Sequence, residues 1–252
     1  MADEALIAVF IDFENLALGA KDAPGGAFEI DLILRRLLQK GRIVYKRAYC
    51  DWSGYQTFVK NFHEHGIELI DIPRTKMSGK NSADIRMVVD ALDLCYAKQH
   101  IDAFALISGD SDFSPLASKL KENDKRVIGC GIKSSTSDLL IGNCDEFIYY
   151  DDLARTAPKK KKATRSRKKP TPRDKQQDAI DMTHEIVRSL EQEYDPLWGS
   201  LVKQTLRRVH PGFTENYYDF KSFSDLLKEA EKRNQLRLEY DDQRGNYIVS
   251  SQ

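Results

Sequence analysis

Short apolar runs alternate with amphipathic segments along residues 1–154, and this alternation restricts the possible fold more than any other feature. Strand-like runs lie at 6–11, 43–49, 67–72, 103–107, 126–130 and 147–150. Helical periodicity is found between them, at 31–39, 55–65, from 81 onward, at 115–122 and around 139–140. Regular alternation of strand and helix indicates parallel strands joined by right-handed crossovers. We therefore expect residues 1–154 to form one three-layer α/β domain.

The segment after residue 80 predicts the longest helix of this domain. Its apolar side chains share one face: Ile85, Val88, Val89, Leu92 and Tyr96. Two acids, Asp90 and Asp93, lie further along the same helix, and we expect both to be solvated.

Aspartates occur where strands end and where the long helix starts. Asp12 ends the first strand, Asp110 and Asp112 follow the run at 103–107, and Asp84 lies in the first helical turn. Taken singly, each has a structural explanation: a helix-dipole partner for Asp84 and turn or cap formation for the others. If the first strand and the 103–107 strand are neighbours at a topological switch point, however, all of these carboxylates converge on one crevice.

Converging carboxylates repel one another unless a proton or a cation lies between them. Mg²⁺ and Mn²⁺ prefer oxygen ligands and keep several waters, so a few carboxylates suffice to bind either ion. A metal so held can activate a water and neutralise charge on a phosphate under attack. We therefore predict Mg²⁺ or Mn²⁺ as the cofactor. His63 and His65 fall on a polar helical region, where we expect them to be solvated.

Three sequence stretches, 10–16, 80–84 and 108–113, resemble the three signatures of the NYN domain, and the resemblance spans about residues 5–150. That family belongs to the PIN-like nuclease superfamily and is similar to bacterial LabA-type proteins. The resemblance implies a metal-dependent ribonuclease. It also implies that four acids surround the Mg²⁺ or Mn²⁺ ion and act in catalysis: Asp12, Asp84, Asp110 and Asp112. Asn15 and Ser108 match the polar supporting positions of the family.

Residues 155–178 carry 11 basic and 2 acidic residues and no apolar side chain larger than alanine. Such a segment cannot bury enough surface to fold, so we expect a flexible basic linker. It would serve as a simple tether, as a nuclear localisation signal, or as a contact for the phosphates of RNA. The residues that we predict to bind RNA there are Lys159, Lys160, Lys161, Lys162, Arg165, Arg167, Lys168 and Lys169.

Residues 179–252 form the third part of the chain. Apolar periodicity predicts three helices, followed by two strands that flank the turn signal at 244–246. Three helices followed by a hairpin describe a small winged-helix domain. Residues 217–227 resemble the core of the OST-HTH (LOTUS) domain, and the resemblance covers roughly 178–250. It implies RNA binding or docking to a partner protein, with Lys221 near phosphates.

Within this third part, Phe223, Leu226 and Leu227 are predicted core residues. Tyr217 and Tyr218 either stack on bases or pack between helices. Because residues 179–252 carry 10 basic and 13 acidic residues, an RNA-binding surface there has to be local. The candidates for it are Lys203, Arg207 and Arg208.

The leading hypothesis is a two-domain, metal-dependent ribonuclease that hydrolyses phosphodiester bonds of single-stranded or structured RNA. The first alternative is a non-catalytic RNA-binding regulator that retains the acidic site. The second is a phosphatase of the haloacid dehalogenase kind, which needs a second aspartate two residues after the first. Glu14 occupies that position here, and no catalytic lysine follows.

Cellular location is predicted from the cysteines and from the absence of targeting signals. Four widely spaced cysteines without a CxxC pair indicate reduced, buried thiols. The N-terminus lacks the apolar core of a signal peptide, and no apolar run reaches membrane-spanning length. We therefore expect a soluble cytoplasmic protein without a membrane partner, and the oligomeric state stays open.

Overall fold

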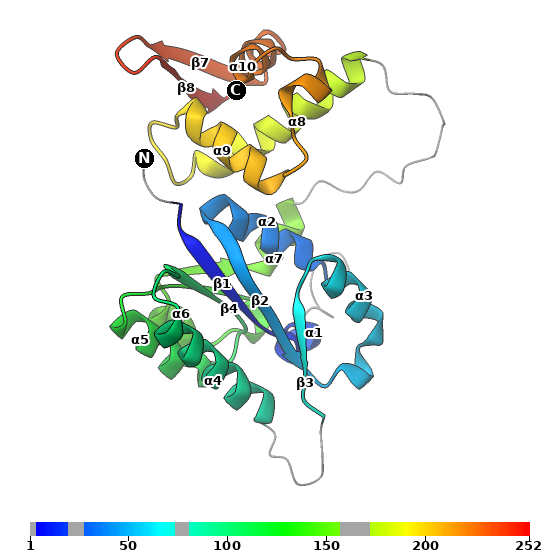
Figure 1. Ribbon diagram of the computed structural model, residues 1–252, viewed down its shortest axis with the longest axis vertical. Helices are drawn as coiled ribbons and strands as arrows, with labels where there is room; N and C mark the ends of the chain where they lie inside the picture. The colour runs from blue at the N-terminus through cyan, green and yellow to red at the C-terminus, as the bar shows by residue number, and fades with distance from the viewer. Residues whose placement is uncertain (1–3, 20–27, 74–80, 157–171) are drawn as a thin grey trace. The chain divides into compact units, whose positions relative to one another are not determined.

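Six parallel strands form a single sheet in the N-terminal part of the computed structural model, in the order β3-β2-β1-β4-β5-β6 (Figure 1). Their bounds are β1 Leu6–Asp12, β2 Arg42–Cys50, β3 Glu68–Asp71, β4 Ala103–Ile107, β5 Arg126–Gly131 and β6 Glu146–Tyr149. The central strand β1 pairs with β2 on one side and with β4 on the other. The strand order reverses between β1 and β4, so this pair is the topological switch point of the sheet.

Helices cover both faces of the sheet and complete three layers. One face is covered by α1 Phe13–Gly19, α2 Ile30–Lys40, α3 Gln56–Glu64 and α7 Tyr150–Thr156, and the other by α4 Ser82–Ala97, α5 Ser114–Glu122 and α6 Asp138–Asn143. Side chains of β1 alternate between the two cores: Val9 points to the first and Phe10 to the second. The predicted α/β architecture with a parallel sheet is confirmed.

The structure describes residues 4–19, 28–73, 81–156 and 172–252. The chain divides into two units, Met1–Lys159 and Lys160–Gln252. Among the described residues, no helix is both long enough and apolar enough to cross a bilayer.

Helix α4 packs on the sheet with a different face from the one that its large apolar residues define. Its buried residues are Met87, Asp90, Ala91 and Cys95, whereas Ile85, Val89 and Tyr96 are exposed. The rings of Phe10, Tyr49 and Phe104 stack on this side of the sheet and fill the space beneath the helix. The predicted apolar face is therefore split: Val88 and Leu92 pack partly against the core, whereas Ile85, Val89 and Tyr96 remain exposed.

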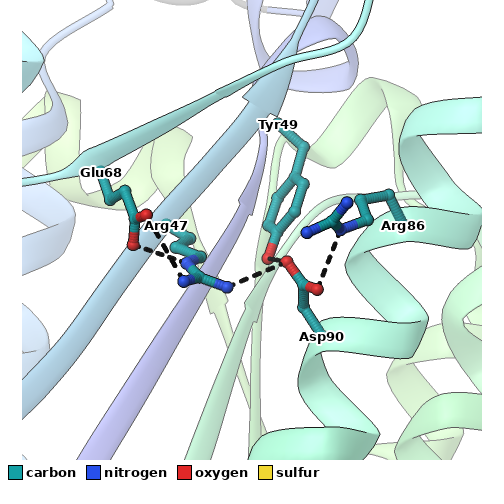
Figure 2. Close-up of polar contacts among 5 residues, drawn as sticks. All are labelled: Arg47, Tyr49, Glu68, Arg86 and Asp90. Atoms are coloured by element: carbon teal, nitrogen blue, oxygen red, sulfur yellow. Dashed lines mark hydrogen bonds and ion pairs between the residues drawn. The ribbon is translucent and has the colours of Figure 1, made fainter.

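Asp90 is only 9% exposed, so our prediction of a solvated side chain was wrong. Its Oδ2 accepts hydrogen bonds from Tyr49 Oη at 2.9 Å and from Arg47 Nη1 at 3.1 Å, and its Oδ1 accepts one from Arg86 Nε at 2.9 Å (Figure 2). Arg47 Nε also donates to Glu68 at 2.6 Å. The carboxylate is tolerated inside because cationic and hydroxyl donors surround it. Asp93 is exposed, as predicted.

The C-terminal unit contains three helices followed by an antiparallel hairpin. The elements are α8 Pro172–Leu190, α9 Gly199–Val209, α10 Phe223–Lys232, β7 Leu236–Asp241 and β8 Asn246–Ser251. Phe223, Leu226 and Leu227 belong to its buried core, as predicted. Ser222 Oγ caps α10 by accepting a hydrogen bond from Asp225 N–H at 3.1 Å. The observed order agrees with the predicted one, and its assignment as a winged helix stays a prediction.

The predicted linker 155–178 differs from the structure at both ends. Residues 155–156 complete α7, and residues 172–178 form the first turns of α8. Polar residues extend a helix at little cost when its later turns are packed, and a proline is well suited to the first turn. Arg233, the residue directly after α10, donates to Gln176 at 3.0 Å and to Gln177 at 2.9 Å, which attaches this polar start to the rest of the unit.

We predict that Asp90→Ala lowers the free energy of unfolding of the N-terminal unit by about 2 kcal/mol, because buried donors lose their charged acceptor. The measurement is urea unfolding of the full chain in a Trp198→Phe background, where Trp52 reports on this unit alone. Asp93→Ala, on the exposed face of the same helix, is the control and should change stability by less than about 0.5 kcal/mol. Equal effects of the two substitutions would contradict the stabilising role of the buried carboxylate.

Candidate metal centre

Asp12 is the last residue of the central strand β1 and is only 6% exposed. Its Oδ2 accepts a hydrogen bond from Ser108 Oγ at 2.8 Å, and its Oδ1 accepts one from the Asn15 N–H at 3.3 Å. Burial raises the pKa of Asp12 to about 7, and the negative charges of Asp84 and Asp110 act in the same direction. The carboxylate therefore lies near two others in a poorly solvated place.

The loop after β4 brings the second group of acids to the same edge of the sheet. Ser108 Oγ, besides donating to Asp12, accepts from the Asp110 N–H at 3.1 Å. Asp110 Oδ1 accepts from the Asp112 N–H at 2.9 Å and so caps the short 3-10 helix η3 Ser111–Phe113. Ser108, predicted as a supporting residue, thus connects the end of β1 to the acidic loop.

Asn15, the other predicted supporting residue, holds the same loop from the side of α1. Its Oδ1 accepts a hydrogen bond from the Gly109 N–H at 2.9 Å. A Cβ atom at Gly109 would lie 2.5 Å from the backbone oxygen of Ser135, so the loop can approach this closely only with glycine. Asn15 and Gly109 together fix where the acidic loop leaves β4.

Asp84 extends the cluster to the first turn of α4, where it is half-buried. Burial raises the pKa of Asp84, and the charges of Asp110, Asp112 and Glu14 raise it further. Asn81 Nδ2 donates to Asp112 Oδ2 at 3.2 Å, which joins the start of α4 to η3. The four predicted acids are therefore close enough to influence one another electrostatically, although they come from three separate segments.

Glu14 also belongs to the acidic cluster, although its sequence position pointed only to the phosphatase alternative. It lies in the first turn of α1, directly after β1, and its Oε1 accepts a hydrogen bond from the Asp51 N–H at 3.3 Å. Its position two residues after Asp12 was the available signal, because any acid at the start of a helix that follows the central strand lies near the switch point.

The acids do not form a closed metal cage. Within residues 4–19, 28–73, 81–156 and 172–252, no three His, Cys, Asp or Glu side chains are close enough together to hold an ion. The donors of the cluster are all oxygen atoms, which suit Mg²⁺ and Mn²⁺. Mg²⁺ keeps several waters and binds through one or two carboxylates together with substrate phosphates. The residues therefore fit a hydrated divalent ion at an open site.

The predicted RNA-binding residues of the basic segment, 159–162, 165, 167, 168 and 169, lie outside the described residues. Lys221 is exposed just before α10. Of the local candidates on the C-terminal unit, Lys203 and Arg207 both pair with Glu215, at 3.0 and 3.1 Å. That acid offsets part of their positive charge, which makes them weaker phosphate-binding residues than the sequence suggested.

The two tyrosines of the C-terminal unit have different environments. Tyr217 is 60% exposed, and the ammonium of Lys175 lies 4.9 Å from the centre of its ring. Tyr218 is partly buried and stacks on Phe213 with 5.1 Å between ring centres. Tyr217 is thus accessible for stacking, whereas Tyr218 packs between elements of the unit.

Comparisons with known proteins give relatives for the N-terminal unit. An uncharacterized protein of Methanocaldococcus jannaschii is 30% identical over 120 residues, which cover 48% of this chain and 47% of that protein. The chain thus spans about half the length of this curated relative. The crystal structure of a protein of unknown function from Vibrio parahaemolyticus has 25% sequence identity and a TM-score of 0.53, and the match covers 61% of this chain and 97% of that chain.

The match to a protein family covers the whole parallel sheet and the acidic cluster. It extends over residues 6–151, more than half of the chain, and the matching family is described as NYN domain. The haloacid dehalogenase alternative has no support in this match. From the sheet, the cluster and the length of the match, we conclude that the chain belongs to the NYN domain family, part of the PIN-like nuclease superfamily.

Proposed function

We propose that this protein is a ribonuclease that depends on Mg²⁺ or Mn²⁺ and hydrolyses phosphodiester bonds of RNA. One observation carries the proposal: carboxylates from the end of β1, the start of α4 and the loop after β4 share one poorly solvated place at the switch point of the sheet. Ligands of open α/β sheets bind at such crevices. Membership in the NYN family supports a nuclease over other uses of an acidic crevice.

The residues of the site have separate roles in this proposal. Asp12, Asp84 and Asp110 would hold the ion, at least one of them through a bound water, and Asp112 would either join them or orient the attacking water. A bound divalent ion supplies an activated water and neutralises charge on the phosphate. Ser108 keeps the carboxylate of Asp12 in place through the 2.8 Å hydrogen bond between their side chains.

A second candidate function, an RNA-binding regulator without turnover, is favoured by one observation. The described residues include no group of three potential metal ligands that is ready to enclose an ion. A site of this kind would bind RNA and release it unchanged. The cleavage experiment below separates the two functions.

We assign the C-terminal unit and the basic segment to substrate binding. Three helices and a hairpin agree with a winged-helix module of the OST-HTH kind, which would hold RNA or a partner protein. The lysines and arginines of 159–169 would attract the phosphate backbone without regard to sequence. We also propose a cytoplasmic location, which is supported by the four cysteines of the described residues, none of which forms a disulfide.

The first prediction concerns cleavage. With a pool of single-stranded RNA and Mn²⁺, the parent chain should produce shorter fragments, and Asp84→Asn and Asp110→Asn should each lower the rate at least about 100-fold because a charged ligand is lost. The measurement is a gel-based cleavage assay, with RNA affinity followed by fluorescence anisotropy. Affinity should be largely unchanged, since most of the phosphate contacts in this proposal belong to the basic segment and not to the metal centre.

Asp93→Asn, an exposed acid on the same helix as Asp84, is the matched control and should cleave like the parent. Undiminished cleavage in EDTA, or equal rates for parent and Asp110→Asn, would contradict metal-dependent catalysis. Tight RNA binding without any product would favour the regulator.

A second prediction concerns metal binding alone. Mn²⁺ should raise the melting temperature of the parent, because an ion that binds only the folded state stabilises it. In EDTA, Asp84→Asn should melt above the parent, since removing one charge relieves repulsion in the cluster. The same variant should lose most of the increase caused by Mn²⁺. A thermal shift that is equal in parent and variant would show that the ion binds elsewhere.

A third prediction concerns the basic segment. Substituting lysines 159–162 together with glutamine should weaken RNA binding and make it less sensitive to salt. The slope of log affinity against log salt should fall in magnitude by up to about 3 for single-stranded RNA. Lys60→Gln, which removes an 89% exposed lysine of α3, is the control. An unchanged salt slope after the fourfold substitution would exclude a role for the segment in phosphate binding.

A further inference from the structure

Large apolar side chains are exposed beside the metal centre. Ile85 and Val89 on α4 are 64% and 48% exposed, and Leu139 on α6 is 60% exposed. Together with Val88 they line a groove of about 710 Å³, to which α5 also contributes residues; we refer to it as the α4–α5 groove. Exposed apolar residues that gather around one hollow mark a binding site more often than scattered ones do.

The α4–α5 groove is continuous with the candidate metal centre. Asp84 and Asp112, two of the four predicted acids, belong to its lining, and so do Asn81 and Ser111. A molecule that fills the groove therefore reaches carboxylates of the metal centre. This continuity relates the groove to the substrate of the site.

The charges of the groove favour a neutral group. Among the described residues that line it there is no lysine or arginine, and the charged side chains are Asp84 and Asp112. A phosphate would be repelled unless the ion of the metal centre neutralised it. If a nucleic acid reached the groove, its base and ribose would therefore suit the lining better than its phosphate.

Ser114 gives a second, independent indication of a ligand. It lines the α4–α5 groove and is 4% exposed, and its Oγ has no hydrogen-bond partner among the residues that the structure describes. Buried hydroxyl groups almost always have a partner. This Oγ is shielded from solvent, so an amide, carbonyl or hydroxyl group of a nucleoside would pair with it only after rotation about the Ser114 side-chain bond turned it toward the groove.

We propose that the α4–α5 groove binds the base and ribose of one nucleotide of single-stranded RNA, adjacent to the phosphodiester at the metal centre. The inference rests on the proposed ribonuclease function and adds a subsite to it. Apolar side chains provide the surface on which the flat faces of a base pack, and the polar side chains provide hydrogen bonds to its edges. Bases in a duplex are stacked and cannot enter, so the groove selects unpaired RNA.

The test compares RNA with and without bases. The triple substitution Ile85→Ser, Val89→Ser and Leu139→Ser adds no charge and changes only exposed residues. With Asp110→Asn present to prevent cleavage, fluorescence anisotropy in Mn²⁺ measures binding of a short oligoadenylate and of an abasic oligomer of equal length. The triple substitution should weaken oligoadenylate binding about tenfold and leave abasic binding unchanged. Tyr96→Ser, an exposed apolar residue of α4 outside the groove, is the matched control.

Ser114→Ala provides a second variant that does not depend on the apolar wall. Because the hydroxyl has no partner among the residues that the structure describes, its loss should not lower the melting temperature. It should weaken oligoadenylate binding about threefold and leave abasic binding unchanged. A lower melting temperature with unchanged binding would show that the hydroxyl has a structural role instead.

The outcomes separate this inference from the proposed function. If the parent cleaves RNA but the triple variant binds oligoadenylate as the parent does, only the subsite is wrong. If the parent binds neither oligomer, both are wrong. Light scattering of parent and triple variant completes the test: a parent dimer that the substitutions dissociate would assign the groove to contact between two copies and overturn the subsite.

Discussion

The burial of the Asp12 carboxylate at the end of the central strand is the constraint on which the site depends. A buried carboxylate is costly unless donors or a cation compensate for its lost hydration. Ser108, which directly follows the neighbouring strand β4, donates a hydrogen bond to the Asp12 carboxylate at 2.8 Å, and the Asn15 N–H donates a longer one at 3.3 Å. Burial raises the pKa of Asp12 to about 7, and the nearby carboxylates of Asp84 and Asp110 add to the cost of its negative charge. A divalent cation is the group that would relieve all of these costs at once.

Helix α4 contributes to the sheet packing, to the acidic cluster and to the α4–α5 groove, each through a different part of its surface. One side packs on the sheet with Met87, Ala91, Cys95 and Asp90. Arg47, Tyr49 and Arg86 donate hydrogen bonds to the carboxylate of Asp90 (Figure 2). The first turn carries Asp84 into the acidic cluster. The outer side leaves Ile85 and Val89 exposed in the α4–α5 groove. An ion-paired contact between α4 and β2 thus sets the position of both a candidate metal ligand and a candidate base-binding wall.

The strands and the convergence of the acids could be predicted from sequence because both follow from local rules. Apolar runs mark buried parallel strands, and their carboxyl ends meet at one edge, so Asp12 and Asp110 had to lie near each other once β1 and β4 were neighbours. The buried face of α4 could not be predicted in this way. The partners of Asp90 on β2 lie 41 and 43 residues away in the chain, so the apolar periodicity of the helix does not indicate them.

The start of α8 was missed for a related reason. Composition alone predicted a linker at 172–178, but these residues form the first turns of α8. Arg233, directly after α10, binds them to the rest of the C-terminal unit through Gln176 and Gln177. Low apolar content excludes an independent core, but it does not exclude the extension of a helix whose later turns are buried. Sequence also could not predict that Glu215 offsets the charge of Lys203 and Arg207, because these ion pairs depend on tertiary structure.

The most direct measurement of the central claim is anomalous X-ray diffraction from crystals of the full chain grown with Mn²⁺. The account predicts one anomalous peak at the carboxyl end of β1, about 2 Å from a carboxylate oxygen of Asp12 or Asp110, with Asp84 bound directly or through a water. A peak elsewhere in the molecule, or no peak at Mn²⁺ concentrations that support RNA cleavage, would contradict it.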